Sequence, residues 1–363
     1  MERKNQIIAA VVIILIIASY TFITVPYYSS MLWQHNRHVS VPGIEGMSEI
    51  ERFRYLFNNW PHDKPKAVIY FLLFKPRIYS TFIKTLKQLD KFFIKRFKYP
   101  VVLFHEPDLT QSDKEAIRFS TSAEIIFHEV SFSTPDFLRK PAEDYMKVCP
   151  YPSHIGYRHM CRFHTKLVFE TEIMHTAEWY WRLDDDSNIL QHIDYDIFKH
   201  MENQNYKYGY ALISQERDDC VLGLKNNFTH YIKTHNLTPT FFNEWSWSDP
   251  VDQIYNNFEI ASLEFWRSSQ VRDIIEYIDQ SGGIYLARWG DAPIHTMIVS
   301  IFIPRAQIRV FTDIAYSHQL ESTVDRNYTA VDFIKFMLTF TVISVFILFL
   351  LQKYLLKSLF IAT

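Results

Sequence analysis

The stretch Trp179–Asp186 (WYWRLDDD) constrains the fold more than any other part of this 363-residue sequence. Its first five residues are aromatic or large, which favours a buried strand. Three carboxylates follow at once, and burying three anions together is costly unless positive charge compensates them. A divalent cation held by oxygen ligands at the end of the strand would compensate them. A solvated turn is the alternative explanation for a short run of aspartates.

Strand-like and helix-like segments alternate before this stretch. Continuous apolar runs at 66–73, 100–105 and 124–130 predict buried strands, and helical spacing over 78–97 and 113–118 predicts helices between them. This order indicates an α/β fold with a mostly parallel sheet and crossover connections. In such sheets a ligand binds outside the carboxyl ends of the strands, so the three aspartates would lie at the ligand-binding edge.

The segments after the aspartates continue this pattern. They predict a strand at 207–214, a strand and turn at 257–265, helices at 268–280 and 291–302, and a late strand at 308–311. We therefore expect one large α/β domain that includes the aspartate cluster.

Composition excludes several classes of function. The formal charge of −2 gives no basic field for nucleic acid, and the 8 glycines include neither GxGxxG nor GxxxxGK[ST]. Phosphate binding would therefore depend on metal and cationic side chains. Of three cysteines, Cys149 and Cys161 are close enough in sequence to close a short loop, and three buried thiols are equally compatible with the sequence.

Two apolar runs near the chain ends predict membrane anchoring. The first is long enough to cross a bilayer and follows Arg3 and Lys4, which fits an uncleaved signal anchor. Two crossings place the domain between them on the luminal side. Ser48 and Glu51 form a capping box that predicts a helix before the domain. The expected parts are a cytosolic tail (1–6), a signal anchor (7–25), a luminal stem (26–65), a catalytic domain (66–325), a second transmembrane helix (334–352) and a cytosolic tail (353–363).

Further polar residues stand out against apolar surroundings. The segment 157–162 carries three cations that need partners, and Arg182 lies two residues before the first aspartate, where it would bind a carboxylate or a phosphate. Glu259 lies within a predicted strand, either as a structural hydrogen-bonding group or as a catalyst. Asp291 has a plain role as a helix N-cap, and His318 is a candidate metal ligand.

Six motifs, read together, resemble the fungal α-1,2-mannosyltransferase family, glycosyltransferase family 15. The similarity extends from about Lys66 to His318, and its second half is the most specific. The motifs are Tyr157–Phe163 (YRHMCRF), Tyr180–Asp186 (YWRLDDD), Asp194–Phe198 (DYDIF), Asn257–Ile260 (NFEI), Phe265–Ser268 (FWRS) and Gly282–His295 (GGIYLARWGDAPIH).

The resemblance implies a GT-A-type, Rossmann-like mixed sheet flanked by helices. It implies a retaining transfer of mannose from GDP-mannose to the 2-hydroxyl of a mannose acceptor on an O- or N-linked glycan. Manganese is the expected cofactor, and the Golgi or endoplasmic reticulum membrane is the expected location, with the catalytic domain in the lumen.

The resemblance also implies roles for individual residues. The expected metal ligands stand where the family has Glu-Pro-Asp and a distant histidine, and the nucleophile candidate lies in NFEI. The expected sites are a metal site of Asp184, Asp186 and His318, donor-binding residues Tyr157, Arg158, Arg182, Asn256 and Asn257, and catalytic carboxylates Glu259 and Asp291.

The chain departs from the family pattern at several positions. Asp185 replaces the central proline, 74–77 (FKPR) replaces an Arg-Asn pair, and 164–167 (HTKL) replaces Ser-Gly-Phe-Phe. Glu259 would act either as a nucleophile or as a stabiliser of a front-face reaction, and the sequence leaves both mechanisms open. A catalytically inactive glycan-binding protein and a transferase for another sugar nucleotide are the rival functions.

Overall fold

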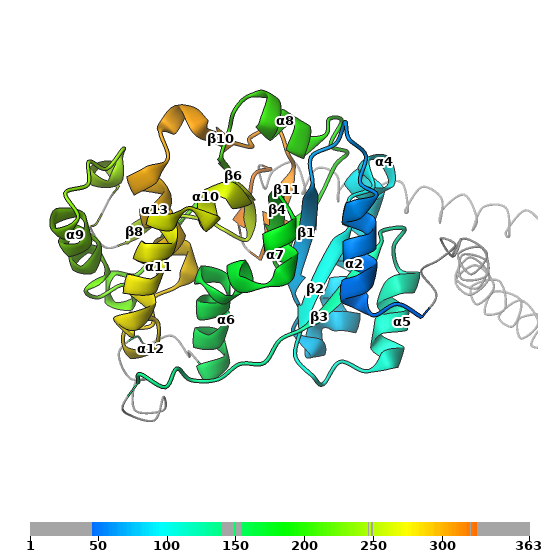
Figure 1. Cartoon of the computed structure of the whole chain (residues 1–363), viewed down its shortest axis with the longest axis horizontal. Helices are drawn as coiled ribbons and strands as arrows, with labels where there is room; N and C mark the ends of the chain where they lie inside the picture. Colours follow the sequence, from blue (N-terminus) through cyan, green and yellow to red (C-terminus); the bar gives the residue numbers. More distant parts are fainter. Residues whose placement is uncertain are drawn as a thin grey trace, which may run out of the picture.

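The computed structural model of the chain describes residues 46–138, 149, 154–245, 247, 250–319 and 321–324. Its strands form a large mixed sheet and two small ones (Figure 1). The strands are β1 (Ala67–Leu72), β2 (Val101–His105), β3 (Ile125–Glu129), β4 (Trp179–Leu183), β5 (Asn188–Ile189), β6 (Tyr208–Tyr210), β7 (Ile213–Glu216), β8 (Val251–Ile254), β9 (Phe258–Ser262), β10 (Ile308–Val310), β11 (Tyr316–His318) and β12 (Glu321–Ser322).

Helices surround the large sheet, together with short 3₁₀ and π segments. The α-helices are α2 (Glu49–Asn58), α3 (Ile83–Leu89), α4 (Lys95–Phe97), α5 (Gln111–Phe119), α6 (Ile155–Thr165), α7 (Glu172–Thr176), α8 (Ile197–Asn203), α9 (Leu224–Thr234), α10 (Leu263–Arg267), α11 (Ser269–Gln280), α12 (Gly283–Leu286) and α13 (Asp291–Phe302).

The large sheet has seven strands in the order β10-β6-β9-β4-β1-β2-β3. Its only antiparallel member is β9, which pairs with β4 on one side and β6 on the other. The parallel pairs β1–β2, β2–β3 and β1–β4 follow from the crossover helices between these strands. The sheet is therefore mixed, and the carboxyl end of β4 lies beside the amino end of β9.

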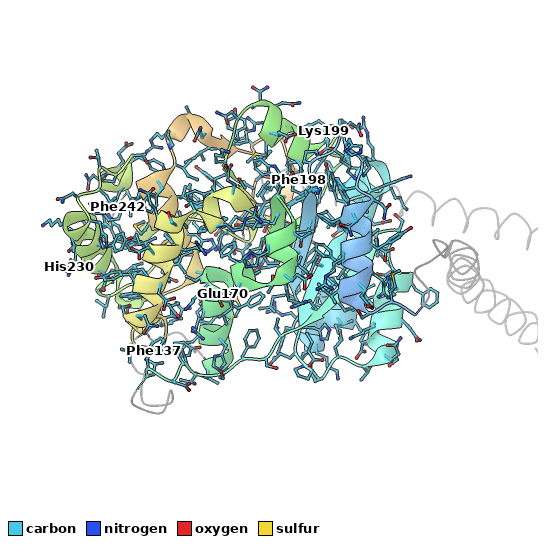
Figure 2. The ribbon with its side chains drawn as sticks, viewed as in Figure 1. Phe137, Glu170, Phe198, Lys199, His230 and Phe242 are labelled. Atoms are coloured by element: carbon cyan, nitrogen blue, oxygen red, sulfur yellow. A yellow bond between two sulfur atoms is a disulfide. The ribbon has the colours of Figure 1, made fainter. Side chains whose placement is uncertain are left out.

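Alternation along β4 divides the core into two layers. Tyr180 joins the cluster that also contains side chains of α2, α6, α11 and α13. Trp179 and Trp181 join the cluster on the other face, beneath α3, α5 and α8. Figure 2 shows Phe242 of the first cluster and Phe198 of the second. Each face of the central sheet is thus covered, as a largely parallel sheet requires.

Most of the predicted segments are confirmed, and three differ in detail. The turn predicted at the end of 257–265 is the start of helix α10. The stretch 207–214 is not one strand, because β6 joins the large sheet and β7 pairs with β8 in another. The helical stretch 78–97 contains two π-helical segments, Ile78–Phe82 and Asp90–Ile94. The capping box of Ser48 and Glu51 begins α2 as predicted. This helix packs against β3 and buries Phe53, although it falls within the expected stem.

The cysteine pairing differs from the short loop considered above. Cys149 is bonded to Cys220, and Cys161 is a buried free thiol. Cys161 lies on α6 and belongs to the first core cluster. Both predicted membrane spans lie outside the described residues. Within the part that the structure describes, no helix is long and apolar enough to cross a membrane.

Candidate active site

The first aspartate, the third aspartate and His318 meet at the carboxyl end of β4. Strand β11 pairs antiparallel with β5, which follows the aspartates directly, and this pairing brings His318 back to them. His318 Nε2 lies 2.7 Å from Asp186 Oδ1 and 3.8 Å from Asp184 Oδ2. The two carboxylates keep 19% and 25% of their side-chain surface exposed, respectively. The three expected metal ligands therefore lie together, with the two carboxylates partly exposed and His318 buried.

This group of side chains fits a divalent cation. Asp186 Oδ1 is buried and, among the described residues, receives no hydrogen bond, even though His318 Nε2 is nearby. Burial raises the pKa of Asp186, but His318 and Arg77 together hold it below its ordinary value. Two carboxylates beside an imidazole form a donor set that manganese accepts.

Tyr255 and Asn257 orient the candidate ligands. The Tyr255 hydroxyl lies 2.6 Å from His318 Nδ1, which leaves Nε2 directed at the carboxylates. Asn257 donates its side-chain amide to Asp184. A hydrogen bond on the second ring nitrogen commonly fixes the orientation of a metal-binding histidine. Sequence reasoning missed Tyr255, and its position beside the Asn256-Asn257 pair was the only available signal.

A buried ion pair lies directly behind this cluster. Arg182 is 2% exposed, forms a short contact with Asp291, and donates to Asp184 Oδ1 at 3.3 Å. Asn256 donates to the same Asp291 oxygen at 2.9 Å. Burial raises the pKa of Asp291, but the Arg182 guanidinium overcomes this effect and holds it well below its ordinary value. Arg182 thus connects the partly exposed carboxylate of Asp184 to the buried carboxylate of Asp291.

The structure corrects the N-cap role expected for Asp291. The N-cap of α13 is Gly290, and no side-chain cap bond forms there. Asp291 is the first helical residue, where a carboxylate is favoured by the helix dipole. Its side chain is directed instead to Arg182 and Asn256, which makes it part of the site.

Glu259 lies beside Arg182 in the sheet but is fully enclosed. The register of β4 and β9 places the two residues opposite each other, so both side chains project from the same face. Its carboxylate is 0% exposed and contacts the hydroxyls of Tyr180 and Tyr208 and the ring of His295. Three donors leave little room for a substrate atom on either oxygen.

The two donor-site candidates on α6 have different surroundings. Tyr157 is half-buried beneath the Arg288 guanidinium, which lies 4.5 Å from its ring, and its hydroxyl is close to Gly290. Arg158 is 1% exposed and donates to the carbonyls of Ile284 and Tyr285. These contacts connect Arg158 to α12.

Arg77 is another site residue that sequence reasoning did not assign. Its guanidinium lies 2.9 Å from Asp185 Oδ1 and 3.4 Å from Asp186 Oδ2. The backbone N–H of Phe74 also donates to Asp185. Burial raises the pKa of Asp185, and Arg77 opposes that shift. The segment 74–77 therefore supports the aspartate run from the end of β1.

The seven-stranded mixed sheet with helices on both faces, and an acidic cluster at the end of its central strand, define a GT-A-type glycosyltransferase fold. Residues 33–331 match the family described as Glycolipid 2-alpha-mannosyltransferase. The chain therefore belongs to this family, which is glycosyltransferase family 15.

Two curated relatives illustrate the similarity. Glycolipid 2-alpha-mannosyltransferase 2 of Candida albicans is 31% identical over 277 residues, which is 71% of this chain and 59% of that protein. Glycolipid 2-alpha-mannosyltransferase of Saccharomyces cerevisiae is 30% identical over 270 residues, which is 70% of this chain and 61% of that protein. The chain thus matches about three fifths of the length of these relatives.

Two solved structures share the fold. Core-mannan synthase A (CmsA/Ktr4) from Aspergillus fumigatus, in a Mn/GDP form, gives a TM-score of 0.68 at 22% identity over 74% of this chain and 78% of that one. The mannosyltransferase Ktr4p from S. cerevisiae, in complex with GDP, gives 0.67 at 20% identity over 81% of this chain and 87% of that one.

Proposed function

We propose that this protein transfers mannose from GDP-mannose to the 2-hydroxyl of a mannose acceptor, with retention of the α configuration. The observation that carries the proposal is the meeting of Asp184, Asp186 and His318 at the ligand-binding edge of the sheet. Family membership, the GDP in two similar solved structures and the manganese in one of them support the choice of donor and metal.

Asp184, Asp186 and His318 would hold the manganese ion. A divalent cation bound there supplies positive charge that stabilises a departing diphosphate. Tyr255 and Asn257 orient the ligands, as described above. The sequence lacks a glycine-rich phosphate loop, so further positive charge would come from side chains such as Arg77, which lies 3.4 Å from Asp186 Oδ2. It is 44% exposed and can turn towards a phosphate.

We infer that transfer proceeds by attack on the same face of the sugar that the phosphate leaves. The C1–O bond to the phosphate breaks, the acceptor 2-oxygen bonds to C1, and the acceptor proton passes to the departing phosphate oxygen. Glu259 stabilises the positive charge that develops on the sugar. The burial of its carboxylate and its three donors support this role over that of a nucleophile.

One experiment tests the activity. The full chain, purified in detergent, is incubated with Mn²⁺, a panel of sugar nucleotides and α-mannoside acceptors, and the product linkage is determined by NMR. We expect an α-1,2-linked mannose from GDP-mannose alone. Glycan binding without transfer would instead favour an inactive glycan-binding protein, and transfer from another nucleotide would overturn the donor assignment.

A second experiment tests the route of retention. A Glu259→Ala protein is supplied with GDP-mannose and azide. A nucleophilic role predicts β-mannosyl azide, because azide would replace the missing carboxylate. Front-face transfer predicts none, and it also predicts that mass spectrometry of the wild-type protein detects no mannosyl adduct on Glu259.

The proposal includes a luminal location in the Golgi or endoplasmic reticulum. The apolar runs at 7–25 and 334–352 with their flanking cations support it, together with the disulfide between Cys149 and Cys220. Protease protection of the domain in sealed microsomes is expected, and digestion without detergent would contradict it.

A further inference from the structure

Glu259 and His295 form a pair that is sealed from solvent. Both side chains are 0% exposed, and His295 Nδ1 lies 2.8 Å from Glu259 Oε2. The other ring nitrogen, Nε2, lies 3.2 Å from the backbone carbonyl oxygen of His164. His295 follows Asp291 by one helical turn on α13, so a single helix places one residue at Arg182 and the other at Glu259.

The partners of His295 determine how many protons it carries. A carbonyl oxygen only accepts hydrogen bonds, so Nε2 must bear a hydrogen. An ionised carboxylate also only accepts, so Nδ1 must bear one as well. The alternative is a neutral ring facing a protonated Glu259. The hydroxyls of Tyr180 and Tyr208 both donate to the same carboxylate, and donors of this kind favour its ionised form.

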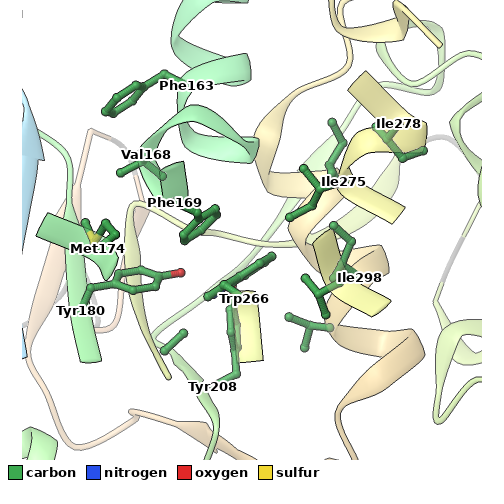
Figure 3. Packing of buried hydrophobic residues seen from close by; sticks show 14 of the residues in the cluster. Phe163, Val168, Phe169, Met174, Tyr180, Tyr208, Trp266, Ile275, Ile278 and Ile298 are labelled. Atoms are coloured by element: carbon green, nitrogen blue, oxygen red, sulfur yellow. The ribbon is translucent and has the colours of Figure 1, made fainter. Parts of the chain in front are cut away.

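The surrounding charges also favour an imidazolium. Arg182 on β4 supplies a neighbouring guanidinium, and it donates to Asp291 and Asp184. Glu259 needs a positive partner of its own, since an uncompensated buried carboxylate is costly. The remaining contacts of the pair are with rings, including Trp266, whose ring lies 4.4 Å from that of His295. Figure 3 shows Tyr180, Tyr208 and Trp266 close together in this layer.

We propose that His295 is a positioning residue that stays doubly protonated and holds Glu259 as an oriented anion behind Arg182. This inference rests on the proposed mannosyl transfer, in which Glu259 stabilises positive charge on the sugar. In that reaction the anion must keep both its charge and its direction, and the imidazolium supplies both. The pair also explains why Glu259 is a poor nucleophile, since its lone pairs are directed at three donors.

His164 provides an internal contrast. It is also buried, but its Nδ1 lies 3.3 Å from the hydroxyl of Tyr70, which can donate to it. Burial, together with the nearby Arg182, lowers the pKa of His164 well below its ordinary value. The two neighbouring buried histidines are therefore expected to differ in charge, with His164 neutral and His295 cationic.

The first test measures the protonation states of the His295 and His164 rings directly. The full chain is labelled with ¹⁵N-histidine, and the imidazole nitrogens are observed by NMR at pH 7 without donor or metal, with His295→Gln and His164→Asn used for assignment. We expect both nitrogens of His295 in the protonated range and one nitrogen of His164 in the unprotonated range. A single neutral tautomer for His295 would overturn the proposal, whether or not the protein transfers mannose.

The second test asks whether His295 acts through Glu259. His295→Gln should lower kcat about 10²-fold while KM for GDP-mannose stays within about threefold, a loss of the size seen when one preorganised group is removed. In a Glu259→Gln background the same change should cost nothing further. An equal loss in both backgrounds would show that His295 acts independently and would overturn the positioning role.

Two tyrosine variants give a matched control if His295→Gln folds poorly. Tyr208→Phe and Tyr70→Phe each remove one buried hydroxyl from the same face of the sheet, but only Tyr208 contacts Glu259. We expect kcat to fall about tenfold for Tyr208→Phe and less than about twofold for Tyr70→Phe. The difference between the two losses corresponds to the free energy of about one hydrogen bond to a charged group. Equal losses would contradict the proposal. A wild-type chain without activity would refute the proposed function instead.

Discussion

The two faces of β4 have opposite characters although their residues alternate in one five-residue strand. On one face, Trp179 and Trp181 pack into an apolar layer with residues of α3 and α8. On the other, Tyr180 and Arg182 join a network of buried charges and hydroxyls around Glu259 and Asp291. The comparison teaches that one face of the strand contributes packing alone, whereas the other holds a buried charge network that contributes to both stability and chemistry. Variants on each face can be used to test that difference.

The largest effect is expected from the proposed metal ligands at the end of the polar face. Asp186→Asn should reduce kcat/KM about 10³-fold, because several kcal/mol of charge stabilisation depend on the cation. The melting temperature should be nearly unchanged, since Asp186 lies at the exposed edge. Steady-state kinetics and thermal unfolding measure the two quantities. Full activity in metal-free buffer would contradict the metal assignment.

Arg182→Met should disrupt the buried charge network on the polar face of β4. The substitution leaves the Asp291 carboxylate buried without its guanidinium partner, which costs about 3–5 kcal/mol of unfolding free energy. Turnover should fall as well, because Arg182 also contacts Asp184. Urea unfolding of the variant and of Arg182→Met/Asp291→Asn tests the cause. The double variant should recover part of the stability, and a double variant no better than the single one would contradict this explanation.

Trp181→Phe tests the apolar face. Trp181 Nε1 has no hydrogen-bond partner within the described part of the chain, so only packing is lost. We expect a loss of about 1–2 kcal/mol, less than the 3–5 kcal/mol typical of truncation to alanine. At 25 °C kcat should stay within about twofold of the wild-type value. A large fall in kcat with a small loss of stability would contradict the division between the two faces.

The smallest expected effect is on the pH dependence of the unfolding free energy in acid. Burial raises the pKa of Asp279, but Arg162 and Lys166 overcome this and lower it. A lowered folded-state pKa stabilises the protein above the unfolded value of about 4, and this contribution is lost as the pH falls through the folded-state pKa. Asp279→Asn should therefore make unfolding free energy less dependent on pH below about 4 in urea titrations. An unchanged slope would show that Asp279 contributes nothing to acid sensitivity.

The strands and the position of the aspartates at the end of β4 could be predicted from the sequence because their signals are local. The runs at 66–73 and 100–105 are continuously apolar, and β1 and β2 are confirmed there. The aspartates follow a strand whose end faces the ligand-binding edge by the rule for parallel sheets. His318 was one candidate among several histidines until the family resemblance singled it out, since no local pattern distinguishes it from another histidine.

The buried network could not be predicted in the same way. Partners such as Glu259 and His295 are 36 residues apart, and their contact depends on how α13 docks on β9. The rows of aromatic residues around Tyr180 predict a strand but do not identify which tyrosines donate to a carboxylate. The Cys149–Cys220 bond spans 71 residues and is equally nonlocal. Tertiary docking, which periodicity does not encode, decides these contacts.

The central claim is that the carboxyl end of β4 binds the nucleotide through a cation. Calorimetric measurement of GDP binding to the full chain, with and without Mn²⁺, tests this claim most directly. Wild-type protein should bind GDP at least about tenfold more tightly with Mn²⁺, equivalent to about 1.4 kcal/mol, and Asp186→Asn should lose this difference. Equal GDP affinity with and without Mn²⁺ in the wild-type protein would contradict the account.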